Sequence, residues 1–162
     1  MGEYIIKIFV TVGSSSFPFD RLIKKIDILG KNKKYQIVAQ IGNGKYIPKN
    51  IKFYTFLKSE KIEKEMKNAD IIISHAGTGS ILTSRNLKCN LILVPRLKKY
   101  KELTNDHQIE LCKELEKNIV VCYDLKNLER KINLAKKINI SSKERELFKI
   151  NLLKYLKQLK TT

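Results

Sequence analysis

The feature that most constrains the fold is the regular alternation of short, almost wholly apolar runs with segments of helical periodicity. The apolar runs span residues 4–12, 35–42, 51–57, 69–74, 90–95 and 118–124. Between them, segments such as 19–30 and 103–117 space their apolar residues three and four positions apart, as amphipathic helices do. Strands that alternate with helices predict a parallel sheet covered on both faces, and strands buried on both sides read as continuous apolar runs.

We therefore expect an α/β fold, a doubly wound Rossmann-like parallel sheet of about six strands. A chain of 162 residues is the size of one domain, and we place the sheet in residues 1–140. Residues 141–162 form a C-terminal amphipathic helix. Its apolar side carries Phe148, Leu152, Leu156 and Leu159, and lysines surround the remainder. This helix either packs back on its own sheet or docks on a partner beside an anionic membrane.

Two loops rich in glycine and hydroxyl groups follow the first and fourth expected strands. If the strand order is 3-2-1-4-5-6, these two strands are neighbours at the topological switch point, where ligands bind beyond the carboxyl ends of the strands. The first loop is GSSSF, which starts with Gly13 and Ser14, and the second is HAGTGS, from His75 to Ser80. We expect both loops to line one crevice.

The GTGS turn suits a diphosphate. Gly77 and Gly79 allow a ligand close to the backbone, and Thr78 and Ser80 supply hydroxyl groups. A helix that begins here directs its free N–H groups and its positive dipole end at the same place. The turn matches neither the Walker nucleotide loop nor the G-x-G-x-x-G dinucleotide motif. The alternative is a tight turn between a strand and a helix, with no ligand.

Each of the two histidines also has two interpretations. His75 ends a strand at the crevice, and it is either a site residue or a structural histidine bonded to a backbone carbonyl. His107 stands between Asp106 and Gln108 at a helix start, where the alternative is a solvated capping turn. A hydrolase triad of Ser14, Asp106 and His107 is disfavoured because the chain has no G-x-S-x-G nucleophile elbow.

Charge and cysteine content exclude several classes of function. The formal net charge of +17 favours an anionic partner. The charge is nearly all lysine, however, and aromatic residues are not interleaved with it, so we expect no nucleic-acid binding. Cys89, Cys112 and Cys122 form no C-x-x-C pair and the histidines lack zinc spacing, so we expect free thiols, no metal and no cofactor. No apolar run reaches the ~20 residues of a membrane span.

Four segments together resemble a known family. FVTVGSSSFPFDRLI, ISHAGTGSIL, VPR and NDHQIELCKELE follow one another along the chain. In this order they resemble the donor-nucleotide half of GT-B glycosyltransferases. More narrowly, the chain is similar to the small catalytic subunit of the two-part UDP-N-acetylglucosamine transferase of asparagine-linked glycosylation, and to bacterial half-enzymes of exopolysaccharide and capsule synthesis. The resemblance runs from about Ile8 to about Asp124.

The resemblance implies roles by position. The substrate-binding residues it implies are Gly13, Ser14, His75, Gly77, Thr78, Gly79, Ser80, Asp106, His107 and Gln108. Residues 77–80 hold the UDP diphosphate, and 106–108 face the donor sugar. His75 is the candidate catalytic residue, although a partner is an alternative source of the general base. The chain departs from the family at Thr83, where an acidic residue usually grips the ribose hydroxyls and threonine makes a weaker contact.

The implied function is that of a glycosyltransferase (hexosyltransferase) subunit. It transfers sugar with inversion from a UDP-sugar to a lipid-linked saccharide in polysaccharide biosynthesis, without metal because no D-x-D motif is present. A GT-B enzyme needs a second Rossmann-like domain for the acceptor, and 162 residues cannot hold both. We therefore expect a membrane-anchored partner, little activity without it, and a cytoplasmic, peripheral location at the inner membrane face. The alternative is a non-catalytic accessory subunit that activates or stabilises a glycosyltransferase partner.

Overall fold

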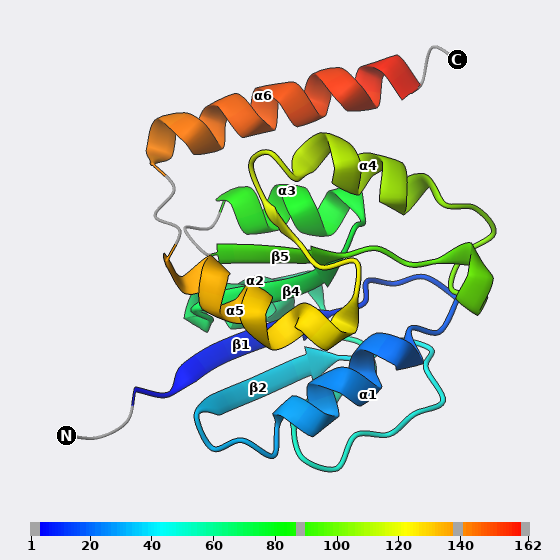
Figure 1. Cartoon of the computed structure of the whole chain (residues 1–162), viewed down its shortest axis with the longest axis vertical. Coiled ribbons are helices and arrows are strands. Elements are labelled where there is room, and N and C mark those ends of the chain that lie inside the picture. Colours follow the sequence, from blue (N-terminus) through cyan, green and yellow to red (C-terminus); the bar gives the residue numbers. More distant parts are fainter. Residues whose placement is uncertain (1–3, 87–89, 138–140, 160–162) are drawn as a thin grey trace.

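The computed structural model of the chain describes residues 4–86, 90–137 and 141–159. Within these residues six strands form one parallel sheet in the order β3-β2-β1-β4-β5-β6 (Figure 1). The strands are β1 (Ile6–Thr11), β2 (Tyr35–Gln40), β3 (Lys52–Tyr54), β4 (Ile71–His75), β5 (Asn90–Val94) and β6 (Val120–Val121). The expected fold class and strand order are confirmed.

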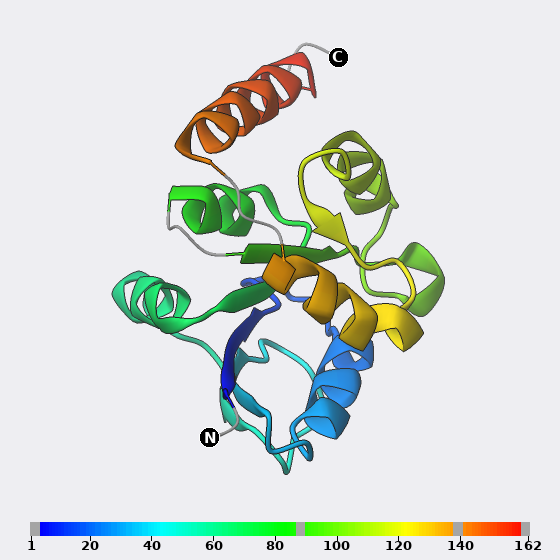
Figure 2. The same cartoon turned by 60° about the vertical axis from the view of Figure 1, so that its left-hand side comes forward.

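Helices cover both faces of the sheet. They are α1 (Asp20–Leu29), α2 (Ser59–Asn68), α3 (Thr78–Asn86), α4 (His107–Leu115), α5 (Leu128–Lys137) and α6 (Ser142–Leu159), with short 3-10 turns η1 (Lys98–Tyr100) and η2 (Leu125–Asn127). Helices α1 and α5 pack on one face, and α2, α3 and α4 pack on the other, with α6 outside α3 and α4 (Figure 2).

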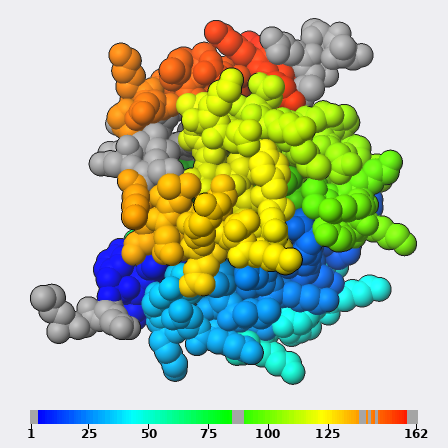
Figure 3. All heavy atoms as spheres, viewed as in Figure 1, coloured from blue at the N-terminus to red at the C-terminus, as the bar shows by residue number. Residues whose placement is uncertain are grey.

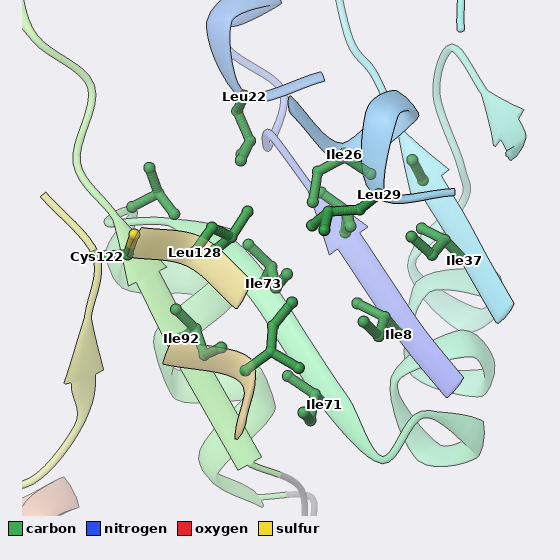
Figure 4. Close-up of a cluster of buried hydrophobic side chains, with 14 of the residues drawn as sticks. Ile8, Leu22, Ile26, Leu29, Ile37, Ile71, Ile73, Ile92, Cys122 and Leu128 are labelled. Atoms are coloured by element: carbon green, nitrogen blue, oxygen red, sulfur yellow. The ribbon is translucent and has the colours of Figure 1, made fainter. Parts of the chain in front are cut away.

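Successive residues of the central strands enter opposite cores, because side chains alternate across a sheet. Ile8 and Ile73 lie in the cluster under α1 and α5, part of which Figure 4 shows. Phe9 and Ile72 lie in the cluster under α2, α3 and α4. A strand that fills two cores must be apolar at every position, which explains the continuous apolar runs of the sequence.

The outer strands are shorter than the sequence predicts. The run 51–57 yields only the three residues of β3, and the run 118–124 yields only the two residues of β6. Both strands lie at an edge of the sheet, where each has a single neighbouring strand. An apolar run therefore does not fix the length of a strand, because apolar content alone does not supply a ladder of hydrogen bonds.

Helix α6 packs back on its own domain. Phe148 and Leu152 are fully buried in the cluster that also holds residues of α3 and α4, and Figure 3 shows α6 lying against α4. The outward side exposes Leu147, Ile150 and Leu153. The packing alternative is therefore confirmed for the inner face. The side chain of Leu159 and the expected boundary at residues 138–140 lie outside the described residues. None of the described helices is long and apolar enough to cross a membrane.

Candidate functional site

The loops after β1 and β4 meet at the carboxyl edge of the sheet. Thr11 and Ser74 are paired in register near the ends of these adjacent strands, so the chain leaves both strands at the same level. Gly13 and Ser14 from the first loop, with Gly79 and Ser80 from the second, line one cavity of about 330 Å³, hereafter the first cavity. The expected convergence of these two loops is therefore confirmed.

The first turn of α3 is open to the first cavity. The first backbone bond of the turn runs from the N–H of Ile81 to the carbonyl of Gly77, at 3.1 Å. The N–H groups of Thr78, Gly79 and Ser80 precede it and have no intrahelical acceptor. A Cβ built on Gly79 would have no protein atom within 4 Å. The protein itself does not require glycine here, and the turn offers an anion both free donors and the positive helix end.

His75 lies between two glycines. A Cβ on Gly13 would come within 2.6 Å of His75 Nε2, and a Cβ on Gly77 would come within 2.8 Å of its Cδ2. Gly13 also has φ +72°, a backbone conformation that disfavours other residues. The imidazole thus fills the space that two missing side chains leave. A side chain at Gly13 or Gly77 would collide with the His75 ring, whereas a side chain at Gly79 would not.

The electrostatic environment keeps the His75 ring neutral. Burial lowers its pKa from 6.5 to about 4, helped by the positive charge of Arg96 and opposed by a hydrogen bond to the backbone of Thr11. The ring is not among the groups that line the first cavity or the cavity described next. The geometry matches the structural alternative, a histidine bonded to the backbone.

A second cavity, of about 530 Å³, lies on the other side of the α3 N-terminus. Gly77 and Thr78 from the turn, His107 and Gln108 from α4, and Leu156 from α6 all line it. The carbonyl oxygen Oε1 of Gln108 accepts a 3.0 Å hydrogen bond from the backbone N–H of Arg96. That bond fixes the amide group and leaves its nitrogen as the hydrogen-bond donor for a ligand.

The other residues of the NDHQ segment are placed differently. Asp106 is exposed, and its Oδ1 accepts a 2.9 Å hydrogen bond from the N–H of Lys98, at the start of η1. It lines neither cavity. The His107 side chain is 73% exposed at the rim of the second cavity, with Nδ1 3.1 Å from Glu110. The structure therefore brings Gln108 and the edge of His107 to the candidate site, but not Asp106.

Thr83 lines the first cavity, one turn into α3. Its hydroxyl group donates a 3.0 Å hydrogen bond to the carbonyl of Gly79 in its own helix. This donor is consequently used inside the protein, and only the lone pairs of the oxygen remain for a ligand.

Arg96 supports the site and was not among the predicted residues. Its side chain is wholly buried after β5. Nη2 donates to the carbonyl of Val12 at 2.8 Å, and Nη1 donates to those of Phe17, Pro18 and Glu102 at 2.9 to 3.3 Å. One guanidinium group thus holds the loop that carries Gly13 and Ser14. An arginine directly after a buried strand, in VPR, was the available signal in the sequence.

The negative charge of Glu102 favours the charged form of this arginine. Burial lowers the pKa of Arg96 to about 10, and Glu102 opposes that shift, so the guanidinium remains charged at neutral pH. The Glu102 carboxylate also receives two 2.9 Å hydrogen bonds from Arg21 of α1 and one from the N–H of Leu97. The network ties α1, the β1 loop and the β5 loop together under the site.

Further residues of the first cavity also lacked a sequence signal. They come from β2, from the segment after β3 and from α2: Gln40, Phe56, Leu57, Ser59, Ile62 and Glu63. Phe56 is 48% exposed, unusual for a large apolar side chain, and it stands at the rim. Such a ring can cover the face of a planar ligand group.

The cysteines are placed as unreactive thiols. Cys112 and Cys122 are free and buried, and burial raises their pKa values to about 12 and about 11. Cys89 lies outside the described residues. In the described part of the chain, no three His, Cys, Asp or Glu side chains are grouped so as to hold a metal ion.

Solved structures share the fold of this chain. The calicheamicin glycosyltransferase CalG4 matches 93% of this chain with 38% of its own, at TM-score 0.65 and 13% identity. MurG of Acinetobacter baumannii matches 93% with 50% of its own, at TM-score 0.57 and 15% identity. The chain therefore has the Rossmann-like fold of GT-B glycosyltransferase domains. In it, the free N-terminus of α3 faces a glycine-containing loop at the switch point.

The family follows from the sequence comparison. The model of the glycosyltransferase family 28 C-terminal domain matches residues 7–152. The chain belongs to this family, which confirms the resemblance found in the motifs.

Curated relatives carry the name UDP-N-acetylglucosamine transferase subunit ALG13. The human protein is 35% identical over 124 residues, which are 68% of this chain and 10% of the relative. The Candida albicans protein is 38% identical over 85 residues, 52% of this chain and 28% of the relative. An NMR structure of ALG13 matches 86% of this chain with 89% of its own, at TM-score 0.57 and 16% identity. The chain thus spans about a tenth of the human relative.

Proposed function

We propose that this chain is the UDP-sugar-binding subunit of an inverting glycosyltransferase, which extends a lipid-linked saccharide in polysaccharide biosynthesis together with a membrane-anchored, acceptor-binding partner. The observation that carries the proposal is Gly79. This exposed glycine in the first turn of α3 has open space where a side chain would stand, in a cavity that Ser14 and Ser80 share. The names of the curated relatives favour a UDP-sugar as the donor.

In this proposal the diphosphate lies on the first turn of α3. The N–H groups of Thr78, Gly79 and Ser80 meet phosphate oxygens, and the positive helix end stabilises the charge as UDP leaves. The uracil base of the nucleotide lies toward Phe56 at the rim of the first cavity. A cavity of about 330 Å³ is at the lower end of the volumes that small ligands occupy.

The transferred sugar lies on the other side of the same turn, in the second cavity. Gln108 is held there by its bond from Arg96, so its amide nitrogen has a fixed direction. A fixed donor recognises a sugar hydroxyl or carbonyl group with little loss of side-chain entropy. Asp106 accepts its bond from Lys98 outside the second cavity and does not touch the sugar.

His75 orders the two loops in this proposal and does not act as the base. Inverting transfer needs a general base within hydrogen-bond reach of the acceptor hydroxyl. The His75 ring is flanked by Gly13 and Gly77, and a pKa of about 4 makes it a weak base. We place the general base on the partner subunit, together with the acceptor site.

The outward face of α6 is the proposed contact with that partner at the cytoplasmic face of the membrane. Leu147, Ile150 and Leu153 are exposed on it, and Lys143 and Lys154 beside them are exposed as well. An apolar stripe flanked by lysines suits both a protein groove and an anionic lipid surface. The variant Leu147→Ser/Ile150→Ser/Leu153→Ser should lose the partner in a pull-down and still bind UDP, since it leaves the buried Phe148 and Leu152 in place.

Calorimetric titration with UDP and with UDP-N-acetylglucosamine tests the function. Binding of both is expected, and a chain that binds neither would refute the proposal. Turnover assays with and without the partner then separate a catalytic donor subunit from an accessory one. If the partner alone transfers sugar and this chain only raises its stability, the accessory alternative holds. Titration with a single-stranded oligonucleotide is the control for binding through net charge alone.

A further inference from the structure

Glu63 is the only charged residue among the described groups that line the first cavity. Helix α2 contributes Ser59, Ile62, Glu63 and Met66 to that cavity, and this spacing places them on one face of the helix. Met66 is buried, whereas the side chain of Glu63 is 54% exposed. Glu63 therefore lines the cavity and still exposes its side chain, so a ligand in the cavity can reach it.

The fold makes little use of this carboxylate. Its nearest cation is Lys67, one turn along α2, with 3.8 Å between Nζ and Oε2 and with the lysine side chain 61% exposed. An exposed pair at that distance contributes little to stability. A ligand that offers two hydroxyl groups could replace this contact at small cost.

Across the cavity, α3 lacks an equivalent group. Thr83 carries no charge, and its hydroxyl group donates to the carbonyl of Gly79. A vicinal diol is recognised well by a carboxylate, because each hydroxyl can donate to a negatively charged oxygen. Among the described residues that line the cavity, Glu63 of α2 alone supplies such an acceptor.

We propose that Glu63 recognises the ribose diol of the nucleotide, so that the site selects ribonucleoside over 2′-deoxyribonucleoside diphosphates. The inference rests on the proposed function, which puts the diphosphate on Gly79 and Ser80 and the base toward Phe56. The ribose joins these two groups, and Glu63 lines the same cavity. The carboxylate that the chain lacks on α3 is thus supplied from α2.

The test compares UDP with 2′-deoxy-UDP by calorimetric titration of the full chain. Wild type should bind UDP about tenfold or more tightly than 2′-deoxy-UDP, as expected for hydrogen bonds to a charged group. Glu63→Ala should bring this ratio close to one by weakening UDP. Glu60→Ala removes the same charge from the preceding turn of α2, at an exposed position outside the cavity. Lys67→Ala removes the ion pair. Both control variants should keep the wild-type ratio.

Two outcomes would overturn the inference alone: UDP binding with an unchanged ratio in Glu63→Ala, or a ratio that collapses in Thr83→Val and persists in Glu63→Ala. The second would place the diol contact on α3. Failure of wild type to bind UDP at all would instead refute the proposed function, and the inference with it.

Discussion

Nη2 of Arg96 donates a 2.8 Å hydrogen bond to the carbonyl oxygen of Val12. Arg96, two residues after β5, thereby holds the loop that follows β1. The same guanidinium group bonds three further carbonyls and lies 4.8 Å from the centre of the Phe19 ring. Two loops that are distant in sequence therefore share one buried cation. Any change to this cation should alter both stability and the shape of the candidate site.

Arg96→Met should lower the free energy of unfolding by about 3–5 kcal/mol, because it leaves buried carbonyls without donors and a buried carboxylate with less compensation. Urea denaturation at neutral pH measures the loss. Arg96→Lys should rescue little, since an ammonium group cannot reach the same set of carbonyls. Arg130→Met on the exposed side of α5 is the control, with a change within about 0.5 kcal/mol. Similar losses in the two methionine variants would contradict this prediction.

Gly79 and Gly77 should respond in opposite ways. Gly79→Val places a side chain in open space, so the variant should fold with a melting temperature close to that of wild type and lose UDP binding by at least tenfold. Gly77→Ala forces the His75 ring to move and should lower the melting temperature. Thermal unfolding and UDP titration of both variants provide the measurement. A folded Gly79→Val that binds UDP as wild type does would mean that the anion site is misplaced.

The lowered pKa of the partly buried His75 predicts a dependence of stability on pH. The folded pKa of His75 is lowered to about 4 from 6.5, so the unfolded chain binds a proton in this range that the folded chain excludes. Its contribution is complete above pH 6.5 and is lost as the pH falls toward 4, by an amount on the order of 3 kcal/mol.

His75→Gln should remove this dependence. The measurement is the difference in unfolding free energy between parent and variant from pH 7 to 4, since the difference cancels the carboxylates that also titrate. His107→Gln, which removes the exposed histidine of α4, is the matched substitution with which the effect of His75→Gln is compared. Parallel curves for His75→Gln and the parent would argue against a neutral His75 in the folded protein.

Gln108 should matter for the sugar more than for the nucleotide. Gln108→Ala should weaken UDP-sugar binding by about 1–3 kcal/mol and leave UDP nearly unchanged. The truncation also removes the acceptor for the N–H of Arg96. Gln108→Glu restores that acceptor without the amide donor, so it separates a displaced loop from a lost sugar contact. Equal losses for UDP and UDP-sugar in the alanine variant would count against the assignment.

Much of the fold was readable from the sequence because it depends on local patterns. Apolar runs buried in two cores define β1, β4 and β5, and helical spacing defines α1 and α4. The alternation of strands and helices predicted the parallel sheet and its switch point. The GTGS turn and the GSSSF loop could be placed at one edge for the same reason, since parallel strands end at the same edge.

The tertiary structure alone decided which polar groups are available to a ligand. Asp106 and Gln108 are two residues apart, yet one bonds to η1 outside the cavities and the other lines the second cavity. The Thr83 hydroxyl bonds within its own helix, and Glu63 lines the first cavity from α2. Local spacing sets how a segment folds. The partner of a polar group is often a residue far away in the sequence that the fold brings close, as it brings Val12 to Arg96.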